Sequence, residues 1–326
     1  MNETQFVMYA GFLLAAYSVI GNDVIQTLGT FLSSNEKMHW VILWLFAGGI
    51  LTVVLIYGWY ANNGDVSYGR LIGDNISDPK YKSPENIPGF GWPFLLPPII
   101  LLIITRFGIP VSTSFLILTF FNPKNLEDML VKSVSGYGLA FAVAFIFYII
   151  TASFLEKKFI NHPIKEKNKV YWTAAQWVST GFLWGMWLVQ DFANIYVYLP
   201  RQISLELLIG TLVIFLILLA YIFYSKGGAI QSIVRAKTNT IDIRSATFID
   251  LTYGLILLYF KELSKVPMST TWVFIGILAG REIAIRYRLH KSLGKSAMKD
   301  LGMDLLKVTF GLVVSIGLVF LIKWLV

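Results

Sequence analysis

Long apolar runs separated by short polar stretches dominate this sequence. A helix needs about 20 apolar residues to cross a hydrocarbon core of about 30 Å. The runs are continuous and lack the period-two alternation of membrane β-strands. The pattern therefore predicts an all-α protein that crosses a membrane many times. The ten predicted segments lie at about 6–33, 39–61, 91–106, 109–122, 133–155, 172–199, 203–224, 247–262, 267–285 and 305–325.

The composition excludes several other classes of protein. Apolar residues make up 56% of the 326 residues and charged residues 14%, with a mean hydropathy of +0.65, whereas soluble domains carry about 25% charged residues. The chain has no Cys and only three scattered His. We therefore expect neither a soluble domain nor a transition-metal site. We find no nucleophile–base pair and no phosphate-binding glycine loop, so we predict no enzyme, no catalytic residue and no cofactor.

The basic residues predict how the chain is oriented in the membrane. The formal net charge is +8. When the loops between the ten segments are numbered along the chain, 18 of the 27 Lys and Arg fall on one side and 9 on the other. Cytoplasmic loops carry the excess of Lys and Arg. The charge thus indicates a multi-pass protein of the plasma or inner cell membrane with both termini outside, rather than a partner for nucleic acid.

A basic, polar stretch at 157–170 divides the predicted segments into two sets of five. It separates a first membrane repeat, 1–156, from a second, 171–326. An odd number of spans per half means that a duplicated second half is inverted in the membrane. The sequence therefore predicts two inverted five-segment repeats, and it leaves room for a homo-oligomer.

Each half begins with an apolar segment that contains one carboxylate between two amides. The first half has Asn22, Asp23 and Gln26, and the second has Gln190, Asp191 and Asn194. The amides are four residues apart, which places them on one helix face. An Asp in mid-bilayer costs about 2.5–3.5 kcal/mol, so two of them indicate a compensating cation, a proton or a water-filled cavity. We predict broken helices with these six residues at a coupling-ion site. In the alternative interpretation the first helix ends near residue 20, and Asn22 and Asp23 lie in an interfacial loop.

A second signal recurs in two short segments, one in each half. Ser112, Thr113 and Ser114 follow a Pro in the fourth segment, and Ser269, Thr270 and Thr271 follow a Pro in the ninth. Pro suits a first helical turn, and the free N–H groups and hydroxyls of such a turn bind anions. Short, interrupted segments at matching positions are typical of transporter binding sites. We predict re-entrant hairpins whose six hydroxyl residues bind an anion. The alternative is ordinary N-capping of a helix.

Two further polar residues have simpler interpretations. Asp250 stands at the start of the eighth segment, where an acid in the first turn stabilises the helix dipole. Arg201 follows Pro200 at the end of the sixth segment, a position typical of an interfacial anchor.

These motifs resemble those of a known family. The stretch 22–30 resembles the duplicated GANDVANAFGT-type signature of the inorganic phosphate transporter (PiT) family, and 110–114 and 267–271 resemble its PVSTTH signature. The order of the four motifs follows the family layout over most of the chain. Without the long hydrophilic loop of many relatives, the chain resembles a divergent, compact prokaryotic member.

The resemblance implies a symporter that moves inorganic phosphate, or sulfate in some relatives, with sodium ions or protons across the lipid bilayer. The acidic motifs would then serve the ions and the anion, and the hydroxyl motifs would cradle the anion. Phe115 and Trp272 replace the family His, and Gln26 and Gln190 replace Asn. Alternatives are a permease for sulfate or another small oxyanion, and a non-transporting receptor or scaffold.

Overall fold

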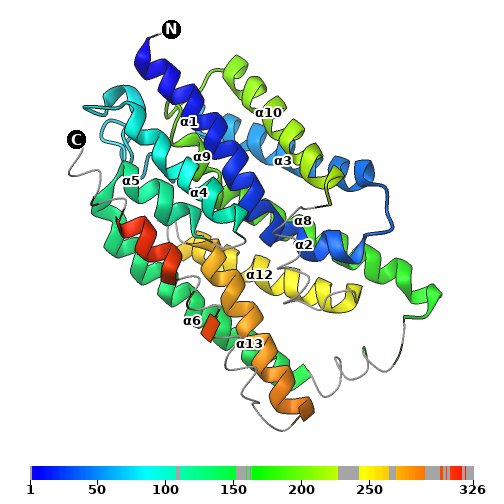
Figure 1. Cartoon of the computed structure of the whole chain (residues 1–326). Helices are drawn as coiled ribbons and strands as arrows, with labels where there is room; N and C mark the ends of the chain where they lie inside the picture. Colours follow the sequence, from blue (N-terminus) through cyan, green and yellow to red (C-terminus); the bar gives the residue numbers. More distant parts are fainter. Residues whose placement is uncertain are drawn as a thin grey trace.

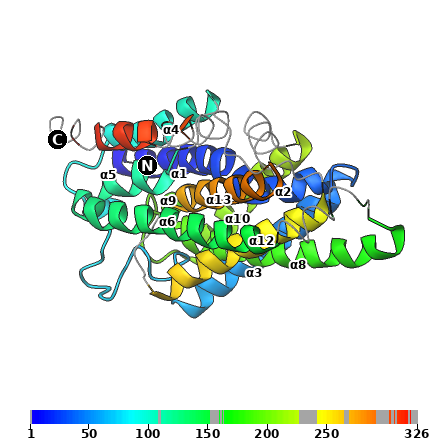
Figure 2. The same ribbon diagram turned by 90° about the horizontal axis from the view of Figure 1, so that it is seen from below.

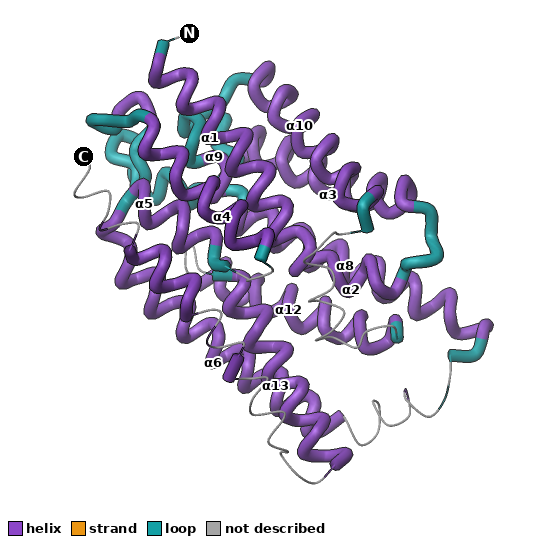
Figure 3. Tube along the Cα trace, in the orientation of Figure 1, coloured by secondary structure: helices purple, strands orange, loops and turns teal. Residues whose placement is uncertain are grey.

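Helices form most of the described chain, and no strand occurs among its residues (Figure 3). The computed structural model describes residues 2–107, 111–151, 159, 162, 164–226, 242–263, 269–290, 302–303, 306, 309–317 and 320, without the side chains of 25, 166, 261–263 and 289–290. Pro110 and Pro267, which precede the two hydroxyl motifs, and part of the predicted linker at 157–170 lie outside these residues.

The helices of the first half follow the predicted segments, although the helix predicted at 133–155 begins seven residues earlier, at Leu126. The first predicted segment is one long helix in three parts, because a π-helical turn joins two α-helices. The elements are α1 (Glu3–Val19), the π-turn η1 (Ile20–Val24), α2 (Ile25–Ser34), α3 (Trp40–Ala61), the 3-10 turns η2 (Pro84–Asn86) and η3 (Trp92–Leu95), α4 (Leu96–Arg106), a second π-turn η4 (Ser114–Leu118), α5 (Thr119–Phe121), the 3-10 turn η5 (Pro123–Asn125) and α6 (Leu126–Thr151).

The described part of the second half is also helical. Its elements are α8 (Glu166–Asp191), the short α9 (Ala193–Tyr196), α10 (Leu205–Tyr224), α12 (Ile243–Leu263) and α13 (Thr270–His290). Among the described residues, five helical stretches are long and apolar enough to cross a membrane. They are Glu3–Val24, Trp40–Ala61, Pro123–Thr151, Leu205–Tyr224 and Ile243–Phe260.

The outer faces of these helices are apolar, as a bilayer requires. Along α10 the side chains of Ile209, Val213, Ile217 and Tyr221 recur every four residues and are all exposed. The opposite face, which includes Phe215, is buried. A soluble protein rarely exposes so large an apolar surface, so this face is suited to lipid.

Helices α3 and α10 lie side by side (Figure 1). Two indole groups of α3 donate hydrogen bonds to main-chain carbonyls of α10 and of the residues just before it. Trp44 Nε1 donates to the carbonyl of Leu216 at 2.9 Å, and Trp59 Nε1 donates to that of Ile203 at 2.7 Å. These bonds satisfy polar atoms that lipid cannot satisfy.

Among the described helices, α6 and α13 make the most extensive contact (Figures 1 and 2). Gly276 and Gly280 of α13, one turn apart, lie directly on the α6 backbone. A Cβ at these positions would collide with the carbonyl oxygens of Tyr137 and Phe141 respectively. Small residues spaced by four are the usual means of bringing two membrane helices into close contact.

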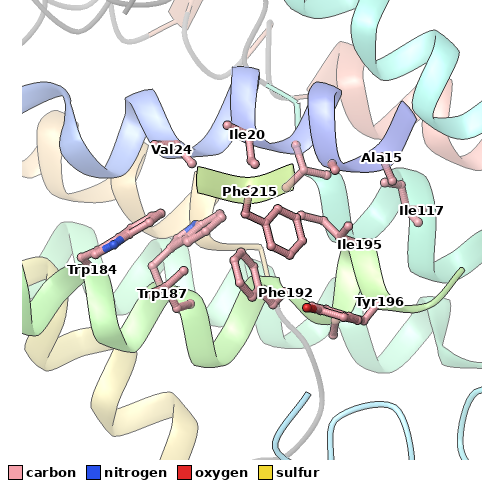
Figure 4. Packing of buried hydrophobic residues seen from close by; sticks show 14 of the residues in the cluster. Ala15, Ile20, Val24, Ile117, Trp184, Trp187, Phe192, Ile195, Tyr196 and Phe215 are labelled. Carbon is pink, nitrogen blue, oxygen red and sulfur yellow. The ribbon is translucent and has the colours of Figure 1, made fainter. Parts of the chain in front are cut away.

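Aromatic packing fixes the point where α8 gives way to α9. The rings of Trp184 and Trp187 stack with centroids 5.0 Å apart, and Phe192 packs on Phe215 of α10 at 4.9 Å. Figure 4 shows Ile20 and Val24 on the first long helix and the rings of Trp184, Trp187, Phe192 and Phe215 on the side that faces them. The core therefore holds the break after Asp191 next to the π-turn that contains Asp23.

Corresponding helices of the two halves make corresponding contacts. Helix α1 packs on α4, and α8 packs on α12, so the first and third segments meet in each half. This pairing agrees with a duplicated chain. The inverted relation of the halves and the division at 157–170 stay predictions.

Candidate functional site

The first acidic motif lies within a π-helical turn. The chain stays helical from Glu3 to Ser34, so the alternative interpretation with an interfacial loop at 22–23 is wrong. Asn22 and Asp23 are both buried. Asn22 Nδ2 donates to Asp23 Oδ1 at 2.6 Å and to the carbonyl of Val111 at 2.9 Å. Single π-turns inside α-helices often occur at functional sites.

The second acidic motif lies where α8 ends. Asp191 is the last residue of α8, Phe192 follows outside both helices, and α9 begins at Ala193. One turn later, Asn194 Nδ2 donates to Asp191 Oδ1 at 3.0 Å. Each half thus has an interruption of its first helix at the aspartate, and each aspartate accepts a hydrogen bond from a nearby Asn.

The two hydroxyl motifs begin helices in the same way. Ser112 Oγ accepts from the N–H of Phe115 at 3.3 Å, and Ser269 Oγ accepts from the N–H of Trp272 at 3.2 Å. These two serines therefore act as N-caps, which was the alternative interpretation of both motifs. The rings of Phe115 and Trp272 also pack against each other at a tilt of 50°, with centroids 6.3 Å apart.

The first hydroxyl motif connects the two acidic motifs. Thr113 Oγ1 donates to Asp23 Oδ2 at 2.7 Å and accepts from Asn194 Nδ2 at 2.9 Å. Ser114 Oγ reaches Asp191 Oδ1 at 3.4 Å. Residues from three distant parts of the sequence thus form a single buried network.

The second hydroxyl motif reaches the same place from the other half. Thr271 Oγ1 donates to the carbonyl of Val111 at 3.2 Å, the same oxygen that accepts from Asn22. Tyr253 of α12 donates its hydroxyl to the carbonyl of Thr270 at 3.0 Å. All four motifs identified from the sequence therefore meet around residues 111–114.

The two glutamines take a lesser part in this network. Gln190 Nε2 donates to the carbonyl of Leu257 on α12 at 2.7 Å, away from the aspartates. Gln26 is buried, and its Nε2 has no hydrogen-bond partner among the described residues. The amides that join the carboxylates are thus those of Asn22 and Asn194.

Several acceptor atoms in the cluster lack hydrogen bonds. Among the described residues, Asn22 Oδ1, Asn194 Oδ1 and Asp191 Oδ2 are buried and have no partner. None of the twelve motif residues is more than 6% exposed. Buried polar atoms are rarely left unpaired. The arrangement therefore offers free oxygens to a cation or to a ligand that carries a proton.

The sequence interpretation of Asp250 is wrong. Helix α12 begins at Ile243, so Asp250 lies about two turns inside it, and it is 1% exposed. The hydroxyls of Thr30 and Thr180 donate to its two carboxylate oxygens, each at 2.5 Å. Asp250 thus joins α12 to α2 and α8. No local pattern in the sequence links these three residues.

Arg201 also differs from its prediction. It is buried, and its Nη2 donates to the carbonyls of Val197 and Leu199, both at 2.6 Å. Arg201 therefore satisfies two carbonyls that follow α9 with hydrogen bonds, and it does not extend to the surface as an interfacial anchor would.

Comparison with solved structures finds the same arrangement of helices. One structure, described as "The sodium-dependent phosphate transporter", matches with a TM-score of 0.62 over 100% of both chains, at 17% sequence identity. The chain shares the fold of that transporter. No family model matches the sequence, and neither does any curated protein.

The shared fold and the five apolar helices make the chain an all-α, multi-pass membrane protein, as predicted. The fold of a phosphate transporter also agrees with the motif resemblance. At 17% identity the match concerns the fold alone.

Proposed function

We propose that this protein is a secondary transporter that carries inorganic phosphate across the cell membrane together with sodium ions. The observation that carries the proposal is the buried network in which Thr113 bonds to Asp23 and accepts from Asn194, beside Asp191. It brings acidic helix interruptions and hydroxyl-rich helix starts to one place. The sodium-dependent phosphate transporter of the same fold supports the choice of substrate and ion.

The anion would bind at the hydroxyl motifs. Ser269, Thr270 and Thr271 surround the start of α13, a helix of 21 residues, whose N-terminus carries about half a positive charge. Ser112, Thr113 and Ser114 supply further hydroxyls from the first half. The two capping serines accept from backbone N–H groups and keep their own hydrogens to donate. Hydroxyls and N–H groups together suit a tetrahedral oxyanion.

The cation would bind at the acidic interruptions. Sodium, as a hard cation, takes oxygen ligands such as carboxylates, amide oxygens and main-chain carbonyls. The free oxygens of Asn22, Asp191 and Asn194 are of that kind. Without a bound cation, the charges of Asp23 and Asp191 would repel an anion at the nearby hydroxyls. Binding of the cation and the anion is therefore coupled, and each raises the affinity for the other.

Phosphate is favoured over sulfate because of the unpaired acceptors. HPO₄²⁻ carries a proton and donates a hydrogen bond, which a carboxylate or amide oxygen accepts, whereas SO₄²⁻ has no proton to donate. Asp191 Oδ2 and the two Asn oxygens are unpaired acceptors of this kind. With sulfate, those of these oxygens that do not coordinate sodium would stay unsatisfied.

Transport would follow from movement of one half against the other. In the structure the side chains of the motif residues are buried. Two inverted repeats would open the site to each side in turn by rocking around it.

Uptake into proteoliposomes tests this proposal. The purified protein is reconstituted, and labelled phosphate and labelled sulfate are supplied with either an inward sodium gradient or an inward proton gradient. We expect sodium to drive accumulation of phosphate above that of protein-free liposomes. Uptake of sulfate in preference to phosphate would contradict the proposed substrate. Uptake driven only by protons would contradict the proposed coupling ion. No uptake at all would contradict the proposal that the protein is a transporter.

A further inference from the structure

A loop between α3 and η2 folds into the molecule. It runs over residues 62–83, and Figure 3 draws it in teal at the end of the bundle near α5. Asp65, Ser67, Leu71 and Tyr81 are all buried. The loop also bonds to its surroundings, because the hydroxyl of Tyr68 donates to the carbonyl of Val54 at 2.6 Å.

A tight turn fixes the start of this loop. The carboxylate of Asp65 accepts from the N–H and the hydroxyl of Ser67, at 2.7 and 2.6 Å, and from the N–H of Gly69 at 2.7 Å. Gly69 has a φ of +77°, which favours glycine. The next residue, Arg70, is therefore held in a defined position.

The side chain of Arg70 extends to the second acidic motif. Its Nε donates to the carbonyl of Val189 at 3.0 Å, two residues before Asp191. The residue is 2% exposed. Burial lowers the pKa of its guanidinium to about 10, and the charge of Asp191 opposes this shift. The group is therefore a cation at neutral pH.

This cation lacks a close counterion. Among the described residues, no carboxylate lies within ion-pair distance of Arg70, and its Nη1 is buried without a hydrogen-bond partner. A buried charge is normally paired, because desolvation alone costs several kcal/mol. An unpaired guanidinium next to the site thus has both the charge and the donor that an anion needs.

We propose that Arg70 is a further anion-binding residue, whose Nη1 holds the oxyanion on the loop side of the Asp191 interruption. The inference rests on the proposed function, because it takes phosphate as the ligand. The guanidinium would hold the anion on its way between the loop side and the hydroxyl motifs. The fork of Arg matches the geometry of a tetrahedral oxyanion better than the point charge of Lys.

Binding of inorganic phosphate to the purified full-length protein tests the inference. The dissociation constant is measured in saturating sodium for the wild type, Arg70→Gln, Arg70→Lys and the control Arg106→Gln. Arg106 is an exposed arginine at the end of α4. We expect Arg70→Gln to weaken binding ~10-fold or more, Arg70→Lys to weaken it less, and Arg106→Gln to bind as the wild type does.

A second measurement separates binding from a merely structural role. If Arg70 contacts the anion, Arg70→Gln raises the KM for phosphate uptake and leaves the sodium concentration for half-maximal uptake, at saturating phosphate, unchanged. A variant that loses thermal stability but keeps its phosphate affinity would overturn the inference. If Arg70→Gln does not fold, wild-type affinity in Arg70→Lys overturns it.

The outcomes also distinguish the inference from the proposed function. A wild-type protein that binds phosphate without transporting it contradicts transport alone, and the comparison of variants still decides the role of Arg70. If the wild-type protein binds sulfate and not phosphate, the same comparison of variants is made with the dissociation constant for sulfate. If neither anion binds, both the proposed transport function and the anion-binding role of Arg70 are contradicted.

Discussion

Thr113 donates a 2.7 Å hydrogen bond to Asp23, a residue 90 positions earlier in the chain. The same hydroxyl accepts from Asn194, 81 positions later. One side chain of the first hydroxyl motif thus joins the acidic interruptions of both halves. A ligand that changes the position of this hydroxyl changes the surroundings of both carboxylates, which is the physical basis of the coupling proposed here.

Replacement of Thr113 should therefore weaken anion binding and coupling together. Thr113→Val keeps the shape but removes the hydroxyl, which leaves Asn194 Nδ2 without one acceptor and Asp23 without one donor. We expect the KM for phosphate to rise ~10-fold or more, since a hydrogen bond to a charged group contributes about 1.5–3 kcal/mol. The matched variant Thr113→Ser retains the hydroxyl and should keep most of the activity. Equal uptake by the Val and Ser variants would contradict the role of this hydroxyl.

Removal of either carboxylate charge should impair the use of sodium. Asp23→Asn and Asp191→Asn preserve the size of the side chain but lose the charge that attracts the cation. We expect sodium-driven phosphate uptake to fall by ~100-fold in each variant, equivalent to about 2.7 kcal/mol. Uptake is measured over a range of sodium concentrations. Wild-type sodium dependence in Asp23→Asn would show that this carboxylate holds no coupling ion.

The capping serines should contribute alike to stability. Ser112 and Ser269 each accept from a backbone N–H three residues later, and replacing an N-cap by Ala costs about 1 kcal/mol. Ser112→Ala and Ser269→Ala should therefore lower the thermal unfolding midpoint in detergent by similar amounts. Ser→Gly at the same positions should cost only a few tenths of a kcal/mol. A large loss in one Ala variant and none in the other would contradict equivalent roles in the two halves.

The contact between α6 and α13 should not tolerate a larger side chain. A Cβ at Gly280 would meet the carbonyl oxygen of Phe141, and overpacking of this kind typically costs about 1–3 kcal/mol. Gly280→Ala should thus lower the unfolding midpoint. Gly138→Ala in α6 is the matched control, because no atom lies within 4 Å of the added Cβ. A control that loses as much stability as Gly280→Ala would show that close packing is not the cause.

The spans and the site motifs were predictable because they follow local rules. A run of about 20 apolar residues has few alternatives to a membrane helix, and the structure confirms helices in the predicted segments that it describes. Asp23 and Asp191 were recognisable because a carboxylate inside an apolar run is energetically costly and usually has a function. Their equivalent positions in two halves of the chain then indicated that they act together.

The contacts of Asp250 and Arg70 were not predictable, because they depend on tertiary structure. The partners of Asp250 lie 220 and 70 positions away, and its depth became evident only when α12 was found to begin at Ile243. Arg70 follows a polar stretch that is typical of an exposed loop, yet the turn at Asp65 directs it inward. Only packing of the loop against α8 distinguishes a buried arginine from a surface one.

The most direct test of the account is the affinity of the purified protein for phosphate, with and without sodium. The central claim is that the acidic and hydroxyl motifs form one site where cation and anion bind together. We predict a Kd for phosphate at least ~10-fold lower in sodium chloride than in choline chloride of equal ionic strength, a coupling of about 1.4 kcal/mol. The same Kd in both salts would contradict the claim.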